Sequence, residues 1–362
     1  MRYIKLVILL LLVQLIYPSI GQAAPSVSAN NAVLIEQTTG RVLYEKAAHE
    51  QQSIASITKI MTAIIAIESG MMEEKATVSR DAIYTEGSSI YLEQGEKITI
   101  EDLVYGLMLR SGNDSAVAIA EHIGGSLDGF VYLMNEKAKW LGMTNTHFDN
   151  PHGLDSDNHY SSAYDMAILM RYAMENKTFQ KISGTTSYQS ENRSYSWRNK
   201  NKLLTQLYDY CTGGKTGYTK KTGRTLVSTA SKDGMDLIAV TLDAPDDWND
   251  HISMFEYGFQ QYKMDSISED GFAEFRIKDI SKNIVGYLNE EIKYPLTESE
   301  ASSLQVKNYI LKEPEDETIG KQLFYLEDTL IAEAPIYSKQ QAERQPTMLS
   351  DMLSFYNELV GK

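Results

Sequence analysis

Residues 56–68 read SITKIMTAIIAIE, and this segment shows how the middle of the chain is built. Apolar side chains recur along it at intervals of three and four residues, which places them on one stripe of a helix: Ile57, Ile60, Met61, Ile64 and Ile65. Gly70 follows as a helix stop signal. A helix with an apolar stripe has to bury that stripe, so we expect this helix to lie against a larger core.

Strand signals stand at both ends of the region that contains this helix. Apolar runs at residues 32–35 and 41–44 surround a turn signal, which predicts a β-hairpin. Two more strand-like runs, at residues 225–229 and 237–242, enclose the turn Asp233-Gly234. Helical patterns are typical of four other segments, at residues 100–109, 114–123, 129–141 and 248–262. We therefore predict an α+β domain whose two ends meet in one sheet.

After residue 263 the pattern changes to short alternating runs such as residues 272–277, which predict a separate, small β-sandwich-like domain. Residues 348–360 place apolar side chains at helical spacing and predict an amphipathic helix. This helix could lie on a membrane surface or pack on the β domain, and the absence of Lys and Arg from its polar face weakens the membrane interpretation. The predicted parts are a signal peptide, the larger domain, the β domain and the terminal helix, at residues 1–23, 24–263, 264–345 and 346–362.

The first residues have the order of a secretory signal peptide. Arg2 and Lys5 precede an apolar run from Leu6 to Tyr17, and small residues follow up to Ala24. The apolar run is shorter than the roughly 20 residues that a membrane-spanning helix needs. We therefore expect export across the cytoplasmic membrane and a place in the cell wall or at the outer face of the membrane.

Composition excludes several classes of partner and site. The chain has 49 acidic and 34 basic residues and a formal net charge of -15, so it lacks the basic surface that nucleic-acid binding needs. Its single cysteine, Cys211, cannot form an intrachain disulfide, and we expect a buried thiol rather than a nucleophile. The spacing of His147, His152 and His159 does not match a zinc site, so we expect a structural loop there and no metal or other cofactor.

Ser56 and Lys59 carry the first sign of chemistry. They lie three residues apart at the start of a helix, so the hydroxyl and the amine share one face. A lysine can take the proton of a serine when burial or another cation keeps its amine neutral. Taken alone the pair is weak, because a serine at a helix start is usually a cap and a lysine is usually solvated.

Two further polar motifs follow along the chain. Ser111-Gly112-Asn113 lies in a predicted loop between two helices, where its side chains could point into a cleft shared with Ser56. Lys215-Thr216-Gly217 runs into a predicted strand, where Lys and Thr could receive a carboxylate and Gly allows a close approach. The same tripeptide recurs at Lys221-Thr222-Gly223, and the chemistry alone does not choose between the copies, since either can be a β-turn with a solvated lysine.

The motifs S-x-x-K, S-x-N and K-T-G in this order resemble the penicillin-recognising serine enzymes. Nearly the whole chain is similar to the low-molecular-mass penicillin-binding proteins that are D-alanyl-D-alanine carboxypeptidases (peptidase family S11), in particular to those of spore-forming Gram-positive bacteria. Four segments carry this resemblance: residues 55–59, 110–114, 150–154 and 214–219. In that family an aromatic residue or His and then Thr follow K-T-G, so Lys215 with Tyr218 and Thr219 matches the family position.

The resemblance implies a serine β-lactamase/transpeptidase-like fold, with an antiparallel sheet flanked by helices. It also implies an enzyme that removes the terminal D-alanine from peptidoglycan stem pentapeptides and that β-lactam antibiotics inhibit covalently. Ser56 would attack and form an acyl-enzyme, Lys59 would take its proton, and Ser111 would protonate the leaving amine. Backbone N–H groups of Ser56 and Tyr218 would hold the oxyanion. The substrate-binding positions would be Asn113, Lys215, Thr216, Gly217, Tyr218, Thr219 and Lys200. Lys200 stands where relatives carry Arg and lacks its bidentate fork, so carboxylate binding would be looser or rest on Thr216 and Thr219.

Three other functions are alternatives to the carboxypeptidase that the motifs predict. A β-lactamase of the class A type would need a Glu in an E-x-x-L-N segment, which the sequence lacks. A D,D-endopeptidase would differ only in the leaving amine that it accepts. A non-catalytic cell-wall scaffold would not need the intact motif residues. A role in growth and a role in spore formation both stay open.

Overall fold

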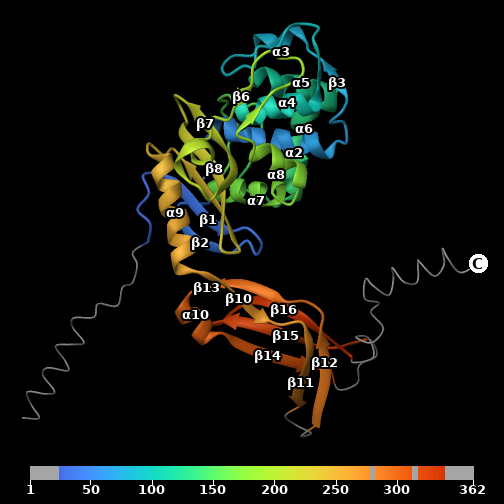
Figure 1. Ribbon diagram of the computed structural model, residues 1–362, viewed down its shortest axis with the longest axis vertical. Helices are drawn as coiled ribbons and strands as arrows, with labels where there is room; N and C mark the ends of the chain where they lie inside the picture. Colours follow the sequence, from blue (N-terminus) through green and yellow to red (C-terminus); the bar gives the residue numbers. More distant parts are fainter. Residues whose placement is uncertain (1–23, 278–281, 312–316, 339–362) are drawn as a thin grey trace, which may run out of the picture. The chain divides into compact units, whose positions relative to one another are not determined.

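The computed structural model describes residues 24–277, 282–311 and 317–338, so the predicted signal peptide and C-terminal helix lie outside it (Figure 1). The chain divides into two compact units. The first holds most of the residues up to 257, and the second holds the residues from 258 onwards together with the short segments 36–41 and 231–237. Within the described part, no helix is both long enough and apolar enough to span a membrane.

A five-stranded sheet in the order β2-β1-β9-β8-β7 supports the first unit. Its strands are β1 (Asn31–Glu36), β2 (Val42–Lys46), β7 (Cys211–Thr219), β8 (Gly223–Lys232) and β9 (Met235–Leu242). The predicted hairpin is confirmed, with Ala32 opposite Lys46 in an antiparallel pair. Because β1 and β9 are neighbours, the two ends of the domain meet in one sheet, as predicted. The strand β7 lies at the edge, where one side of its backbone stays open to a ligand.

Helices fill the chain between β2 and β7 (Figure 1). They are α2 (Lys59–Glu68), α3 (Arg80–Tyr84), α4 (Ile100–Tyr105), α5 (Asn113–Gly124), α6 (Leu127–Trp140), α7 (Ala163–Ala173) and α8 (Lys177–Ser183), and α9 (Asp247–Gln261) follows β9. Two small ribbons lie among them, β3 (Lys75–Thr77) with β4 (Lys97–Thr99) and β5 (Ser187–Tyr188) with β6 (Trp197–Arg198). The predicted helices of this domain are all present, within a few residues of their predicted ends.

The helix α2 is the centre of this unit. The sequence predicts one buried stripe, but every residue from Lys59 to Ile67 is buried. The reason is that five other helices pack around it: α4, α5, α6, α7 and α8. Its first turn, Ala55–Thr58, is a 3-10 turn, so Ser56 precedes the regular helix. The most buried helix of the domain therefore carries both Ser56 and Lys59 at its start.

The second unit is a small β domain, as predicted. Its five-stranded sheet has the order β11-β12-β16-β15-β14, and a separate pair joins β10 to β13. The bounds are β10 (Lys263–Ser268), β11 (Gly271–Ile277), β12 (Lys282–Leu288), β13 (Ile292–Leu296), β14 (Gln305–Ile310), β15 (Thr318–Leu326) and β16 (Thr329–Ser338), with one short helix, α10 (Glu298–Ser303). Its own apolar core includes Phe275, Ile319, Phe324 and Ile336.

Candidate active site

The three sequence motifs meet at one cleft of the first unit, about 410 Å³ in volume. Its walls come from the start of α2, the loops before α5 and around Lys200, the edge strand β7, the strand β8 and the start of α9. The lining residues are Ser56, Ser88, Ser111, Lys200, Lys202, Thr216, Gly217, Tyr218, Arg224, Asp247 and Trp248. Three predicted residues, Lys59, Asn113 and Lys215, lie beneath this surface and are almost fully buried.

Lys59 is bonded directly to the predicted nucleophile. Its Nζ atom lies 3.0 Å from Ser56 Oγ, 2.7 Å from Asn113 Oδ1 and 2.5 Å from the carbonyl oxygen of His152. Asn113 Nδ2 donates to the carbonyl oxygen of Glu86 at 2.5 Å, which fixes Oδ1 as the atom that faces the lysine. Two of the three neighbours of Nζ are therefore carbonyl oxygens, which can only accept.

Burial and neighbouring cations act in the same direction on the two buried lysines. The pKa of Lys59 lies well below its usual value because of burial first and then the charges of Lys215 and Lys200. Burial also lowers the pKa of Lys215 to about 7, with Lys200 as the second cause. A neutral amine at Lys59 near neutral pH is the state that a general base requires.

Ser111 is held between α4 and α5 in a left-handed backbone conformation, with φ at 65°. It follows a π-helical turn, Gly106–Arg110, which continues α4 to the end of the helix predicted at residues 100–109. Lys215 Nζ donates to Ser111 Oγ at 3.0 Å and to the carbonyl oxygen of Thr216 at 2.7 Å. Ser111 Oγ thus accepts from a lysine and keeps its own hydrogen for another partner.

Gly217 lets β7 pass directly beside the nucleophile. A Cβ atom at this position would lie 2.9 Å from the backbone nitrogen of Ser56 and 3.1 Å from that of Ile57. A side chain here would push the strand away from the start of α2. The absence of a side chain therefore brings the backbone of β7 and the backbone N–H of Ser56 into one corner of the cleft.

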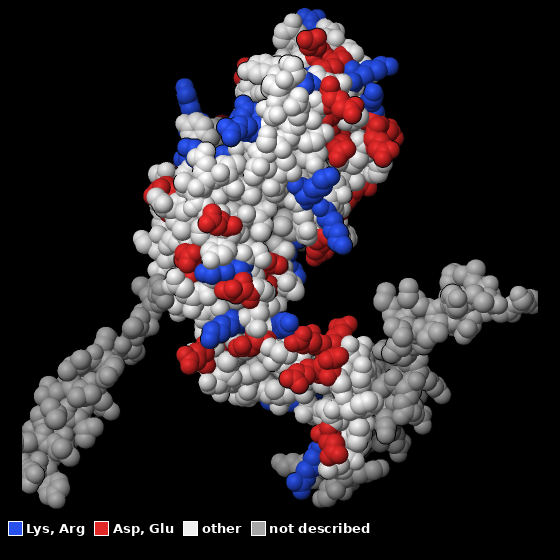
Figure 2. Space-filling view, viewed as in Figure 1, with Lys and Arg blue, Asp and Glu red and all other residues white. Residues whose placement is uncertain are grey.

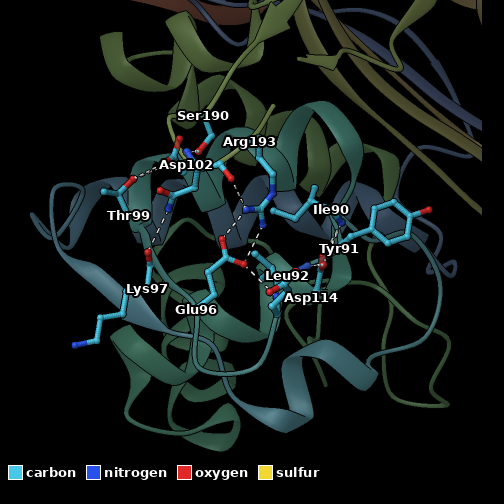
Figure 3. A network of polar contacts seen from close by, with 12 residues as sticks. Ile90, Tyr91, Leu92, Glu96, Lys97, Thr99, Asp102, Asp114, Ser190 and Arg193 are labelled. Atoms are coloured by element: carbon cyan, nitrogen blue, oxygen red, sulfur yellow. Dashed lines mark hydrogen bonds and ion pairs between the residues drawn. The ribbon is translucent and has the colours of Figure 1, made fainter. Parts of the chain in front are cut away.

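A polar network outside the cleft fixes the wall that carries Ser88 (Figure 3). The Asp114 carboxylate accepts from Ser89 Oγ at 2.6 Å and from the backbone N–H groups of Ile90 and Leu92. Lys200 Nζ donates to Ser88 Oγ at 3.0 Å across the cleft wall. The cationic head of Lys200 therefore lies at the cleft wall, where it offers one amine and not the two-pronged donor set of an arginine.

Thr219 is a predicted site residue that does not line the cleft. Its hydroxyl donates to Asp155 Oδ1 at 3.0 Å and lies 2.9 Å from Thr222 Oγ1. A carboxylate beside this hydroxyl disfavours a second carboxylate at the same place. Sequence reasoning could not detect this, because Asp155 comes from a loop more than sixty residues earlier in the chain.

The histidine loop packs against the start of α2. Thr58 Oγ1 lies 2.8 Å from His159 Nε2, and His159 Nδ1 accepts from the backbone N–H of Asp149 at 3.0 Å. Burial lowers the pKa of His159 to about 4 and that of His152 to about 3. In the part of the chain that the structure describes, no cluster of His, Cys, Asp or Glu could hold a metal ion. Cys211 is buried.

Five lining residues escaped the sequence analysis: Ser88, Lys202, Arg224, Asp247 and Trp248. The pairing of β7 with β8 sets Arg224 opposite Tyr218, and α9 starts at Asp247. A signal existed for two of them, since Arg224 directly precedes the strand predicted at residues 225–229 and Trp248 begins the helix predicted at residues 248–262. The others depend on contacts that no local pattern announces.

Residues 19–246 match the family model of the D-alanyl-D-alanine carboxypeptidases, peptidase S11. The chain is 34% identical to the D-alanyl-D-alanine carboxypeptidase DacF of Bacillus subtilis over 336 residues, which cover 87% of this chain and 86% of that one. It is 35% identical to DacC of Escherichia coli over 266 residues, 66% of this chain and 63% of the other. The structure of penicillin binding protein 5 from Haemophilus influenzae is similar with a TM-score of 0.75 and 27% identity, covering 88% of this chain and 98% of that one.

Proposed function

The chain belongs to the family of serine D-alanyl-D-alanine carboxypeptidases, and we propose that it cleaves its substrate through an acyl-enzyme on Ser56. The substrate is a peptidoglycan stem peptide that ends in D-Ala-D-Ala, and penicillins acylate the same serine. One observation carries the assignment: the hydroxyl of Ser56 is 3.0 Å from the buried amine of Lys59. The other residues take roles that follow from this pair.

The hydrogen bonds of Lys59 support its role as the base. A neutral amine has two N–H bonds and one lone pair. Its two carbonyl neighbours, on Asn113 and His152, use the N–H bonds, so the lone pair is left for the Ser56 hydroxyl. After the proton has moved, the same three neighbours can accept the three N–H bonds of the ammonium ion. Little has to move within the site during the step, which favours a low barrier.

Ser111 and Lys215 would serve the second proton transfer. Lys215 donates to Ser111 Oγ, so the hydroxyl hydrogen of Ser111 is available to the nitrogen of the departing D-alanine. The carbonyl oxygen of the scissile bond would lie at the backbone N–H groups of Ser56 and Tyr218. Asn113 would orient the peptide, and Thr216 with Lys200 would bind the terminal carboxylate.

The charge of the cleft supports an anionic substrate. The protein has a formal net charge of -15, and acidic side chains are scattered over both units on the face drawn in Figure 2. Among the described residues that line the cleft, three are cationic, Lys200, Lys202 and Arg224, and one is acidic, Asp247. Such a local reversal of charge favours a ligand with a carboxylate.

Ser56→Ala is the direct test. Without the hydroxyl no acyl-enzyme can form, so we expect no release of D-alanine from a stem pentapeptide and no covalent labelling by a fluorescent penicillin. Ser53→Ala, three residues earlier and outside the cleft lining, is the matched control and should keep both properties. Mass spectrometry of the penicillin adduct locates the acylated residue. Full labelling of Ser56→Ala would mean that another residue is the nucleophile.

Two statements about location belong to the same proposal. The leader pattern of residues 1–23 supports export to the outer side of the cytoplasmic membrane, where peptidoglycan is assembled. Deletion of these residues should leave the protein in the cytoplasm, as cell fractionation would show.

The apolar stripe of residues 348–360 supports a peripheral membrane contact. Truncation after residue 345 should lower the fraction that sediments with membranes and leave D-alanine release in solution unchanged.

A further inference from the structure

Arg224 stands beside the predicted carboxylate site although it belongs to none of the three motifs. In the pairing of β7 with β8, Tyr218 faces Arg224 and Thr216 faces Leu226. Residues directly opposite in an antiparallel pair point to the same face of the sheet, and a residue two positions along is the diagonal neighbour. Arg224 is therefore the diagonal neighbour of Thr216, and both line the cleft.

The guanidinium group of Arg224 is held by two residues at the start of α9. Its Nη2 atom donates to Asp247 Oδ1 at 2.6 Å, and its central carbon lies 5.4 Å from the centre of the Trp248 ring. Its Nε atom is buried and has no hydrogen-bond partner among the described residues. A buried donor without an acceptor is costly, and a guanidinium has five N–H bonds to satisfy. The group is thus charged, oriented by the start of α9, and has one buried N–H without an acceptor at the edge of the cleft.

The other residues predicted to bind the substrate carboxylate do not offer it two parallel N–H donors. Lys200 offers a single amine, already bonded to Ser88. The Thr219 hydroxyl is directed to Asp155. Carboxylates pair best with the planar, two-pronged donor set of an arginine. Arg224 is the arginine of the cleft lining, and it approaches on the face of the sheet that carries Thr216.

We propose that Arg224 binds the terminal carboxylate of the substrate together with Thr216, and that Asp247 and Trp248 position its guanidinium group. Arg224 is then a specificity-determining residue, which makes the enzyme prefer peptides with a free C-terminal carboxylate. The inference rests on the proposed acylation of Ser56, because it concerns how the same substrate is held. In this arrangement Arg224 adds to Thr216 and Lys200 the two-pronged contact that the single amine of Lys200 lacks.

The test compares two substrates in the full-length protein and in Arg224→Gln. One is a stem-peptide analogue that ends in D-Ala-D-Ala, and the other is the same peptide with a C-terminal carboxamide. For the acid we expect kcat/KM to fall about 10- to 100-fold, mainly through KM, as for the loss of a charge-assisted hydrogen bond. For the amide it should change less than about threefold. The preference for the acid over the amide therefore falls about tenfold or more.

Two variants keep the result decisive. Arg276→Gln, an exposed arginine in the small β domain, is the matched control and should keep the full preference for the acid. Arg224→Lys keeps the charge and the neighbour Asp247 but loses the fork, so its preference should fall between those of the wild type and Arg224→Gln. If Arg224→Gln does not fold, as judged by its melting curve, the comparison of the acid and amide substrates is made with Arg224→Lys alone.

An equal loss on both substrates, or no loss on either, would overturn the proposal and leave Arg224 as a clamp between β8 and α9. Penicillin labelling separates this outcome from a failure of the proposed function. If the wild-type protein is not labelled at Ser56, the acyl-enzyme assignment fails. If Arg224→Gln is labelled to full stoichiometry at Ser56 and keeps its acid preference, only the assignment of Arg224 fails.

Discussion

The tripeptide Lys-Thr-Gly occurs twice between residues 215 and 223, and its two copies have opposite surroundings. In the first copy, Lys215 is 2% exposed, donates to Ser111 and lies on the edge strand of the sheet. In the second copy, the Lys221 side chain is 58% exposed and pairs weakly with the exposed Asp157 at 3.6 Å. The difference shows that the three residue types do not make a site by themselves. What makes it is the buried helix start that the first copy meets and the second does not.

The lysines of the two copies should differ most. Lys215→Ala removes the donor to Ser111 and one of the cations that, after burial, lower the pKa of Lys59, so we expect kcat/KM for D-alanine release to fall by about 10²–10⁴-fold. Lys221→Ala should leave it within about twofold, because exposed ion pairs contribute little. Steady-state kinetics on one pentapeptide measure both. Equal effects of the two changes would refute the distinction between the copies.

Much of this contrast could be predicted from the sequence, and the reason is local. The helix at residues 59–68 and the hairpin of β1 and β2 follow from apolar spacing. The choice of Lys215 over Lys221 follows from the resemblance, because Tyr218 and Thr219 match the residues that follow K-T-G in that family. These signals lie within a few residues of each other. The family resemblance then indicated that the three motifs form one site, which residue spacing alone did not show.

The rest of the site depends on contacts between distant segments. Asp155 diverts Thr219, although 64 residues separate them. Arg224 reaches the cleft only because β8 returns along β7, and Asp247 meets it because α9 starts at that point. The complete burial of α2 likewise follows from five helices closing around it, while its sequence shows only one stripe. No local sequence pattern predicts these contacts between distant segments.

The glycines of the two copies should separate rate from stability. Gly217→Ala would place a methyl group 2.9 Å from the Ser56 nitrogen, so β7 or the nucleophile has to shift. A shift of this kind can cost about 100-fold in kcat. Gly223→Ala would instead strain a backbone at φ 71° and crowd Asp243, and neither Gly223 nor Asp243 lines the cleft. We expect it to lower the melting temperature and to spare the kcat of the folded enzyme.

Kinetics at a temperature where both glycine variants are folded, together with thermal unfolding, give the comparison. Wild-type protein and Gly234→Ala, which also has a positive φ but meets no atom within 4 Å, serve as references for backbone strain alone. A Gly223→Ala enzyme with the rate defect of Gly217→Ala would contradict the view that only the first copy touches the nucleophile.

The smallest expected effect concerns pH and tests how the first copy acts. Burial is the largest cause of the lowered pKa of Lys59 and persists in Lys215→Gln, whereas the charge of Lys215, the second cause, is lost. Without the neighbouring cation the ammonium form of Lys59 becomes less unfavourable, so its pKa rises. The base then loses its proton only at higher pH. The acidic limb of the acylation rate with penicillin should therefore move to higher pH.

The rate of covalent labelling at each pH, rather than turnover, is the quantity to measure, because it remains accessible in a slow variant. Lys221→Gln carries the same change of charge in the exposed copy and should leave the limb where it is in the wild type. A limb that moves in neither variant would mean that burial alone keeps Lys59 neutral. Lys215 would then act only through Ser111 and the substrate. A limb that moves in both would mean that the net charge of the hairpin matters rather than the contact between two buried amines.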